Sequence, residues 1–203
     1  MPTGRGEGQV RAVPANEATW EDLQTVLGAR GSGSRCQCQR FKLGRGESFG
    51  SFPQEERAFR LRQQADPGHP GAERTSGLVG YLGSEPVGWC AVEPRSAYDG
   101  LVRVFRVPWE GREEDRADSP VWAVTCVFTR TGFRRQGVSR AMVAATVDFA
   151  RDRGARSLEG YPIATTDVIP EELHVGTLAA FEAAGFTVVS RPTSRRVVVR
   201  LDF

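Results

Sequence analysis

Arginines, a glycine and a serine follow an apolar run near the middle of the chain, in an order that could bind phosphate. Val121–Phe128 is rich in β-branched and aromatic residues, which predicts a buried strand. A short polar turn leads to Arg134-Arg135-Gln136-Gly137-Val138-Ser139, and the sequence predicts an apolar-rich helix from Ser139 to about Arg153. Loop amides and the first unpaired N–H groups of a helix converge, and the helix dipole adds partial positive charge there. We therefore expect a phosphorylated cofactor at this turn.

The form of the loop excludes two common phosphate-binding motifs. No GxxxxGK[ST] string is present, and Lys42 is the only lysine in the chain. No GxGxxG fingerprint follows an early strand either. Arg134 through Ser139 instead resembles the [QR]-x-x-G-x-[GA] pyrophosphate loop of the GCN5-related N-acetyltransferases (GNAT). Ser139 replaces the usual final glycine or alanine, and its small side chain still allows close backbone approach.

The chain after this loop is similar to the same family in order and spacing. Gly154 is a plausible end for the helix, and Arg156–Tyr161 is typical of a strand. Thr177–Phe186 resembles the family pattern A-x-x-L-Y-E-x-x-G-F, and two closing strands are predicted at Thr187–Ser190 and Arg195–Asp202. The resemblance covers roughly Ser119–Phe203, and upstream of it only the order of elements agrees.

One strand, two helices and a hairpin are predicted upstream. Thr19 begins a helix with an apolar face of Leu23, Val26 and Leu27, and a second helix places Phe59 and Leu61 inward. The predicted ranges are a strand at Gln9–Val13, helices from Thr19 and over Pro53–Ala65, and a hairpin of Gly77–Leu82 and Val87–Val92.

The resemblance implies an α/β (α+β) fold of the GNAT type. Its sheet would be mixed, mostly antiparallel and twisted, with about seven strands flanked by helices and splayed between strands 4 and 5. We expect a flexible tail over residues 1–8 and a single acetyltransferase domain over 9–203, with an acetyl-CoA-binding core at 119–190.

The resemblance also implies the residues that hold acetyl-CoA, the expected co-substrate, with no metal. The main chain of Val127, Phe128 and Thr129 would bind the pantetheine arm. Arg134 opens the loop, and the pyrophosphate would lie on the amides of Arg135, Gln136, Gly137, Val138, Ser139 and Arg140. His174 stands where the family usually has an asparagine that contacts the cofactor arm. A helix cap or a general acid are the other roles that we consider for His174.

The resemblance offers two positions for the general base, and only one of them carries a glutamate in this chain. The glutamate used by many histone-type members is replaced by Ala123, whereas Glu159 matches the fifth-strand glutamate of ribosomal-protein-type members. An ion pair between Glu159 and an arginine is an equally open interpretation. The usual acid, a tyrosine, is replaced by Phe181. Tyr161 could substitute as the acid or could be a core aromatic residue.

The four cysteines form no recognisable disulfide or zinc motif, and the role of Cys36-x-Cys38 stays open. Cys36-x-Cys38 is too tight for an ordinary disulfide and lacks the usual zinc-ligand spacing. Cys126 falls near the expected thioester, where a buried thiol is favoured over an acetyl-cysteine intermediate. Free thiols and an N-terminus without an apolar signal core predict a reducing cytoplasm. An arginine content far above that of lysine is typical of a GC-rich bacterial source.

The predicted function is acetyl transfer from acetyl-CoA to a primary amine of a small molecule or peptide. Acidic residues within Trp109–Pro120 could attract such an amine, although a mobile, solvated surface loop neutralised by Arg112 and Arg116 is the favoured interpretation. The alternative function is a non-catalytic acyl-CoA-binding module. A nucleic-acid binder using Phe133, Arg134, Arg135 and Arg140 is weaker, because a net charge of +2 predicts no extended basic face. No apolar run approaches the length of about 18 residues that a membrane span needs, so we expect no membrane partner. Whether the chain forms a homodimer is left undecided by the sequence.

Overall fold

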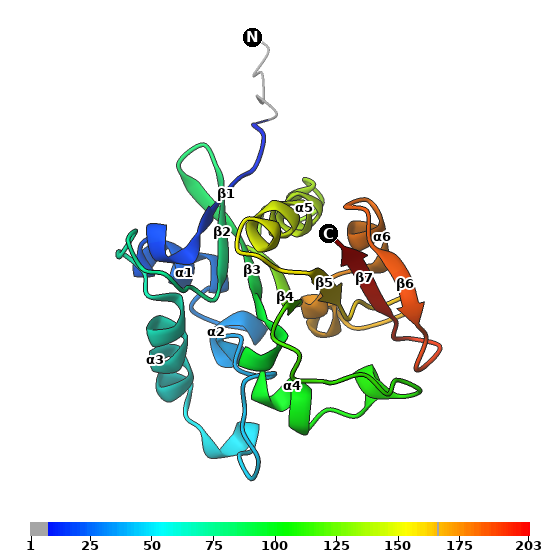
Figure 1. Cartoon of the computed structure of the whole chain (residues 1–203). Helices are drawn as coiled ribbons and strands as arrows, with labels where there is room; N and C mark the ends of the chain where they lie inside the picture. The colour runs from blue at the N-terminus through cyan, green and yellow to red at the C-terminus, as the bar shows by residue number, and fades with distance from the viewer. Residues whose placement is uncertain (1–7, 166) are drawn as a thin grey trace.

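A seven-stranded mixed sheet lies at the centre of the computed structural model, which describes residues 8–165 and 167–203 (Figure 1). The strands follow the order β1-β2-β3-β4-β5-β7-β6, and every neighbouring pair is antiparallel except the parallel pair β4–β5. The strands are β1 (Arg11–Pro14), β2 (Gly77–Leu82), β3 (Glu85–Pro94), β4 (Val121–Thr129), β5 (Ser157–Gly160), β6 (Thr187–Ser190) and β7 (Val198–Asp202).

Six α-helices connect these strands in the described part of the chain. The first begins as its sequence predicts, because the Thr19 hydroxyl accepts a hydrogen bond of 3.0 Å from the Asp22 amide. The helices are α1 (Trp20–Leu27), α2 (Ser32–Cys36), α3 (Gln54–Ala65), α4 (Asp99–Arg103), α5 (Val138–Arg151) and α6 (Leu178–Glu182). Short 3-10 turns include η3 (Arg95–Ala97), η4 (Val107–Trp109) and η5 (Pro170–Val175).

Helices cover both faces of the sheet. Apolar residues of α5 and α6 pack with Leu78, Cys90 and Val124 on one face, whereas α1 and α3 pack on the other with Val79 and Trp89. Figure 1 shows α1 and α3 on one side of the sheet and α5 on the opposite side. The alternation of side chains along a strand explains how neighbouring residues reach different cores.

Two glycines let α5 lie close to the sheet. A Cβ on Gly80 or Gly88 would collide with Met142, the fully buried methionine of α5. Since α5 begins directly after the predicted phosphate loop, this close packing fixes the loop relative to β3 and β4. Glycine at these strand positions reflects close approach by another element.

The predicted splay between strands 4 and 5 is confirmed. The parallel pairing of β4 with β5 stops at Val124 and Gly160, although β4 continues to Thr129. A bulge also disturbs the pairing of β3 with β4, because Ala91 faces Cys126 and Val92 faces Val124, so that Thr125 has no partner. The end of β4 is therefore paired on its β3 edge only.

The predicted α5, the β2–β3 hairpin and the closing strands are confirmed, with boundaries that move by a few residues. The inward placement of Phe59 is wrong: its ring is 58% exposed, while Leu61 on the same helix is buried. Residues 1–7 of the predicted tail lie outside the described residues. The division into a tail and one domain stays a prediction.

Candidate active site

The open edge of β4 forms one wall of a groove. Val127, Phe128 and Thr129 line a cavity of about 400 Å³, together with Arg134, Arg135 and Ser139 from the loop and the start of α5. The opposite wall comes from the chain after β5 and comprises Leu173, His174, Gly176 and Thr177, with Ser32 at the rim. Alternate residues at the end of β4 direct N–H and C=O groups toward this edge, where they are available to an extended ligand arm.

The loop before α5 presents unsatisfied donors. In the described part of the chain, the amides of residues 134–140 donate no hydrogen bond to the protein. Arg135 (φ 62°) and Gly137 (φ 76°) adopt left-handed conformations, which turn successive amides toward one side. A Cβ on Gly137 would meet no atom within 4 Å. This arrangement of free amides, arginines and open space fits a pyrophosphate group.

The predicted cofactor residues divide into two sets. Those that line the groove are Val127, Phe128, Thr129, Arg134, Arg135, Ser139 and His174. Two others turn their side chains elsewhere: Val138 is buried in the α5 core, and the Gln136 amide donates to the Gly132 carbonyl at 3.2 Å. Neither they nor Gly137 and Arg140 line the groove, and the contacts predicted for these four are those of their backbone amides.

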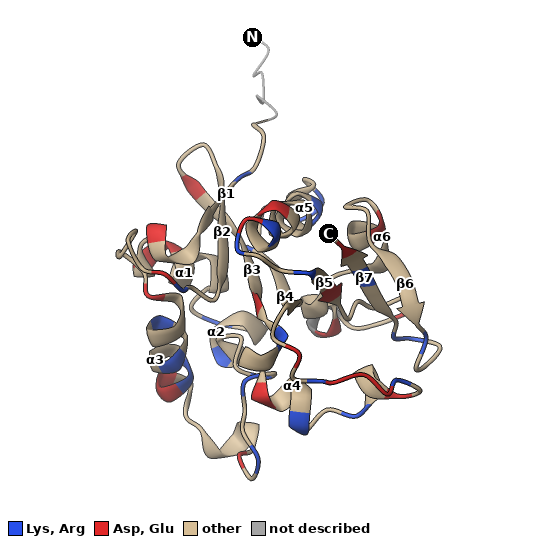
Figure 2. Cartoon of the chain, viewed as in Figure 1, with Lys and Arg blue, Asp and Glu red and all other residues tan. Residues whose placement is uncertain are grey.

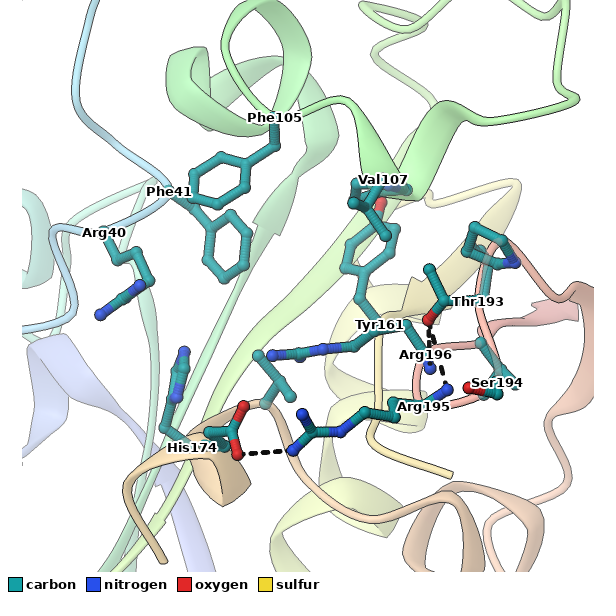
Figure 3. A pocket seen from close by; sticks show the side chains of 16 residues that line it. Arg40, Phe41, Phe105, Val107, Tyr161, His174, Thr193, Ser194, Arg195 and Arg196 are labelled. Carbon is teal, nitrogen blue, oxygen red and sulfur yellow. Dashed lines mark hydrogen bonds and ion pairs between the residues drawn. The ribbon is translucent and has the colours of Figure 1, made fainter. Parts of the chain in front are cut away.

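His174 lies where three hollows meet. Besides the groove, it lines a second cavity of about 380 Å³ and a third of about 170 Å³. Figure 3 shows its ring at one end of the second cavity, with Arg40 beside it and Arg196 extending across from the other wall. The imidazole is therefore the titratable group that connects the groove to both neighbouring spaces.

The third, smallest hollow carries thiols. Cys36, Cys38 and Cys126 line it with His174, and all four cysteines of the chain are free. The Trp89 indole donates to the Cys38 sulfur at 2.9 Å. A hydrogen bond with Cys38 and burial raise the pKa of the Cys126 thiol well above its ordinary value. A thiol held protonated is a poor nucleophile, which favours the structural role over an acetyl-cysteine intermediate.

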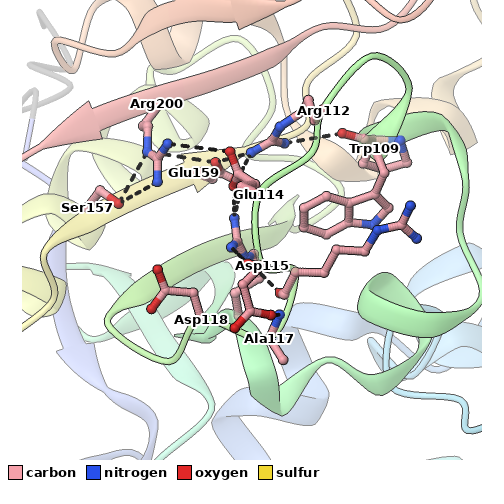
Figure 4. Close-up of polar contacts among 12 residues, drawn as sticks. Trp109, Arg112, Glu114, Asp115, Ala117, Asp118, Ser157, Glu159 and Arg200 are labelled. Carbon is pink, nitrogen blue, oxygen red and sulfur yellow. Dashed lines mark hydrogen bonds and ion pairs between the residues drawn. The ribbon is translucent and has the colours of Figure 1, made fainter.

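Glu159 is the centre of a buried ionic cluster (Figure 4). Its fully buried carboxylate is 3.1 Å from the Arg95 guanidinium and 2.5 Å from that of Arg112, with Arg200 at 3.8 Å. Glu114 joins the cluster through Arg95 and Arg112, each at 2.7 Å. The structure thus supplies the arginine partners that the ion-pair interpretation of Glu159 requires.

Tyr161 belongs to the same cluster. Its hydroxyl donates to the Glu159 carboxylate at 3.0 Å. Burial and the charge of Glu159 raise the pKa of Tyr161 well above its usual range. A phenol whose proton is held this firmly is a weak acid for a departing thiolate. The catalytic assignment of Glu159 and Tyr161 stays a prediction, and their contacts favour a structural role.

Most residues of the loop between η4 and β4 are exposed, as the favoured interpretation expects, but Trp109 and the Arg112 side chain are buried and fix its first half against the ionic cluster. The guanidinium carbons of Arg95, Arg112 and Arg116 lie 4.9–5.2 Å from the centroid of the buried Trp109 ring. The Arg112 side chain is only 7% exposed. Figure 2 shows acidic and basic residues alternating along this loop. None of its acidic residues lines the second cavity, so they form no acidic rim there.

Phe181, at the family's tyrosine position, is fully buried rather than exposed to the groove. A Cβ on Gly160 or on Gly176 would collide with its ring, and Phe186 packs against it edge to face with centroids 5.1 Å apart. A hydroxyl at this position would need a buried hydrogen-bond partner.

Sequence reasoning missed most of the second cavity. Its walls come from Arg40, Phe41, Phe105, Val107, Pro108, Glu172, Val175 and the 192–198 segment. Phe41 and Phe105 are in contact, with ring centroids 4.7 Å apart. These residues come from four segments without a shared motif, and only the aromatic residues flanked by arginines offered a hint.

The fold and groove agree with a comparison against family models. Residues 42–161 match the acetyltransferase (GNAT) family, and the chain therefore belongs to this family, whose members transfer acetyl groups from acetyl-CoA. No curated protein sequence matches the chain.

Solved structures share the fold at low identity. A GCN5-related N-acetyltransferase from Kribbella flavida is 13% identical with a TM-score of 0.54, covering 96% of this chain and 98% of that one. The ribosomal-protein-alanine N-acetyltransferase from Brucella melitensis is 18% identical with a TM-score of 0.51, covering 96% and 99%. The PaiA N-acetyltransferase from Thermoplasma acidophilum, solved with coenzyme A, is 10% identical with a TM-score of 0.50, covering 96% and 99%.

Neither a membrane-spanning helix nor a metal-binding group of side chains occurs within residues 8–165 and 167–203. No helix there is long and apolar enough to cross a bilayer. No three histidine, cysteine or acidic side chains are grouped to hold a metal ion.

Proposed function

We propose that this protein transfers the acetyl group of acetyl-CoA directly to the primary amine of a small molecule or peptide. One observation carries the proposal: the groove with free loop amides ends at His174, where a second cavity of substrate size begins. Two adjoining sites that share a titratable side chain are what a direct transfer between two bound molecules needs.

The residues of the groove suit acetyl-CoA. The amides of residues 135–140 would hold the pyrophosphate, with Arg134 and Arg135 adding positive charge, and the end of β4 would bind the pantetheine arm. The Thermoplasma acidophilum protein of the same fold was solved with coenzyme A, which supports this assignment. When bound, acetyl-CoA supplies an activated thioester.

His174 is the side chain that we assign to proton transfer. An amine must lose a proton to become a nucleophile, and the base must stand between the two sites. Glu159 is also a proposed base, but its carboxylate is occupied by Arg95, Arg112 and Tyr161. These contacts support His174 as the base, with Glu159 and Tyr161 holding the neighbouring wall.

Replacing His174 tests this role. We expect His174→Gln to lower kcat by roughly 10²–10⁴-fold, as is typical for loss of a general base, with acetyl-CoA affinity within about threefold of wild type. Thiol release gives the rate and calorimetry gives the affinity. His69→Gln is the matched control, because His69 lies in an exposed loop and pairs only with Asp66 among the described residues.

Two outcomes would contradict the assignment. Unchanged kcat in His174→Gln would remove His174 from proton transfer. A selective loss of acetyl-CoA affinity would make it a cofactor contact, the role that the family resemblance implies.

The second candidate function is a non-catalytic acyl-CoA-binding module. The buried Phe181 and the paired Glu159 favour it, because neither common catalytic group is available in the groove. Tight acetyl-CoA binding without thiol release from any primary amine would favour this module over the enzyme.

A further inference from the structure

The second cavity has apolar walls and a charged rim. Phe41 and Phe105 form one wall (Figure 3), and Val175 and Val198 also line the cavity. A volume of about 380 Å³ suits a small molecule rather than a folded protein surface. The apolar lining would stabilise an aromatic or branched apolar group by removing its surface from water.

The charge of this cavity is positive. Three arginines line it, namely Arg40, Arg195 and Arg196, against one described carboxylate, Glu172. Arg195 pairs with Glu172 at 2.9 Å and is therefore neutralised. Arg40 and Arg196 form no ion pair with a carboxylate of the described residues.

Arg196 is the more buried of the two. Burial lowers the pKa of Arg196, and the positive charges of Arg195 and Arg40 act in the same direction against the opposing charge of Glu172. Guanidinium groups that are partly desolvated and close to like charges are stabilised by an anion. The planar guanidinium also matches the geometry of carboxylate and phosphonate groups.

We infer that the acceptor is a small primary amine that carries an apolar, typically aromatic, body and an anionic group bound by Arg196 and Arg40. The inference rests on the proposed function and names its substrate class. Amino-acid-like molecules have this chemistry, with a carboxylate or a phosphonate as the anion. Polyamines and aminoglycosides do not, because the two arginines repel a polycation.

The position of His174 sets the orientation of such an acceptor. His174 is shared by the cavity and the groove, whereas Arg196 enters from the opposite wall (Figure 3). The Arg196 guanidinium extends across the cavity toward Arg40 and His174, so an acceptor with its anion on the two arginines would place an amine on the adjacent carbon beside His174. The apolar group would then lie against Phe41 and Phe105.

Matched acceptors test the inference directly. Thiol release from acetyl-CoA is measured with phenylalanine, with its aminophosphonate analogue and with phenethylamine, which keeps the ring and amine but lacks the anion. We expect kcat/KM to fall roughly 10- to 100-fold when the anion is removed, and the first two acceptors to show which anion is preferred. The KM for acetyl-CoA should not change.

A variant connects this preference to the arginine. Arg196→Gln should reduce the preference for an anionic acceptor to about threefold or less while leaving acetyl-CoA affinity unchanged. Arg191→Gln is the matched control, because Arg191 is exposed at the start of the same turn and does not line the cavity. It should keep the wild-type preference.

Several results would overturn the inference. They are equal kcat/KM for phenylalanine and phenethylamine, a preference for spermidine, or a loss of acetyl-CoA affinity in Arg196→Gln. If no amine supports thiol release, the proposed transfer fails. Calorimetry of phenylalanine and phenethylamine with the CoA-saturated protein then decides whether the cavity selects an anion.

Discussion

Gly137→Val should lower the affinity for acetyl-CoA by at least about 100-fold, which corresponds to roughly 2.7 kcal/mol. Gly137 has a φ of 76° and precedes α5, where free amides converge. A β-branched residue in this conformation is strained and drives the backbone away from the geometry that directs the amides to one point. Its side chain would also fill the open space beside them. Isothermal calorimetry measures the effect.

The chain provides a closely matched control for this substitution. Gly154 follows the other end of α5 and has a φ of 78°, and a Cβ placed on it would also meet no atom within 4 Å. Gly154→Val should therefore cost similar backbone strain and keep acetyl-CoA affinity within about twofold, since the helix C-terminus has no anion-binding amides. Equal losses in both variants would mean that general destabilisation, not the loop, controls binding.

Glu159→Gln should lower the free energy of unfolding by about 3 kcal/mol, the scale expected when a buried charge loses its partner. Arg95 is 1% exposed and Arg112 is 7% exposed, so water cannot replace the lost carboxylate charge. The loop that contains Trp109 and Arg112 should also become more accessible to proteases. Urea denaturation gives the free energy, and limited proteolysis reports on the loop.

Glu113→Gln is the matched control, because Glu113 is exposed on the same loop and has no described ion-pair partner. Its effect should stay within about 0.5 kcal/mol. The result that would contradict the ion-pair role is a Glu159→Gln protein of wild-type stability whose turnover falls by roughly 10²–10⁴-fold with intact acetyl-CoA affinity. That combination would identify Glu159 as the general base.

Local patterns explain why much of the fold could be predicted. The apolar run of β4, the glycine of the loop and the periodic apolar residues of α5 lie within about thirty consecutive residues, where strand, turn and helix preferences act directly. The Thr19 cap and the β2–β3 hairpin depend on equally short patterns. The separation of β4 from β5 after Val124 could be predicted only from the family resemblance, because no local pattern indicates it.

The acceptor cavity and the ionic cluster could not be predicted in the same way. Arg112 and Arg95 are 47 and 64 residues from Glu159, and no local preference indicates that they meet. Sequence alone left base and ion pair equally open for Glu159, because both need a carboxylate on that strand. His174 was recognised by its position relative to Phe181, but its place among three cavities depends on the fold.

The most direct test of the central claim is calorimetric titration of acetyl-CoA into the purified wild-type protein, with desulfo-CoA and ATP as comparison ligands. The account predicts saturable binding of acetyl-CoA and desulfo-CoA at one site per chain, because both carry the pyrophosphate and pantetheine arm that the groove fits. ATP should bind far more weakly, since it lacks the arm. No binding of acetyl-CoA, or equal binding of ATP, would contradict the assignment of the groove.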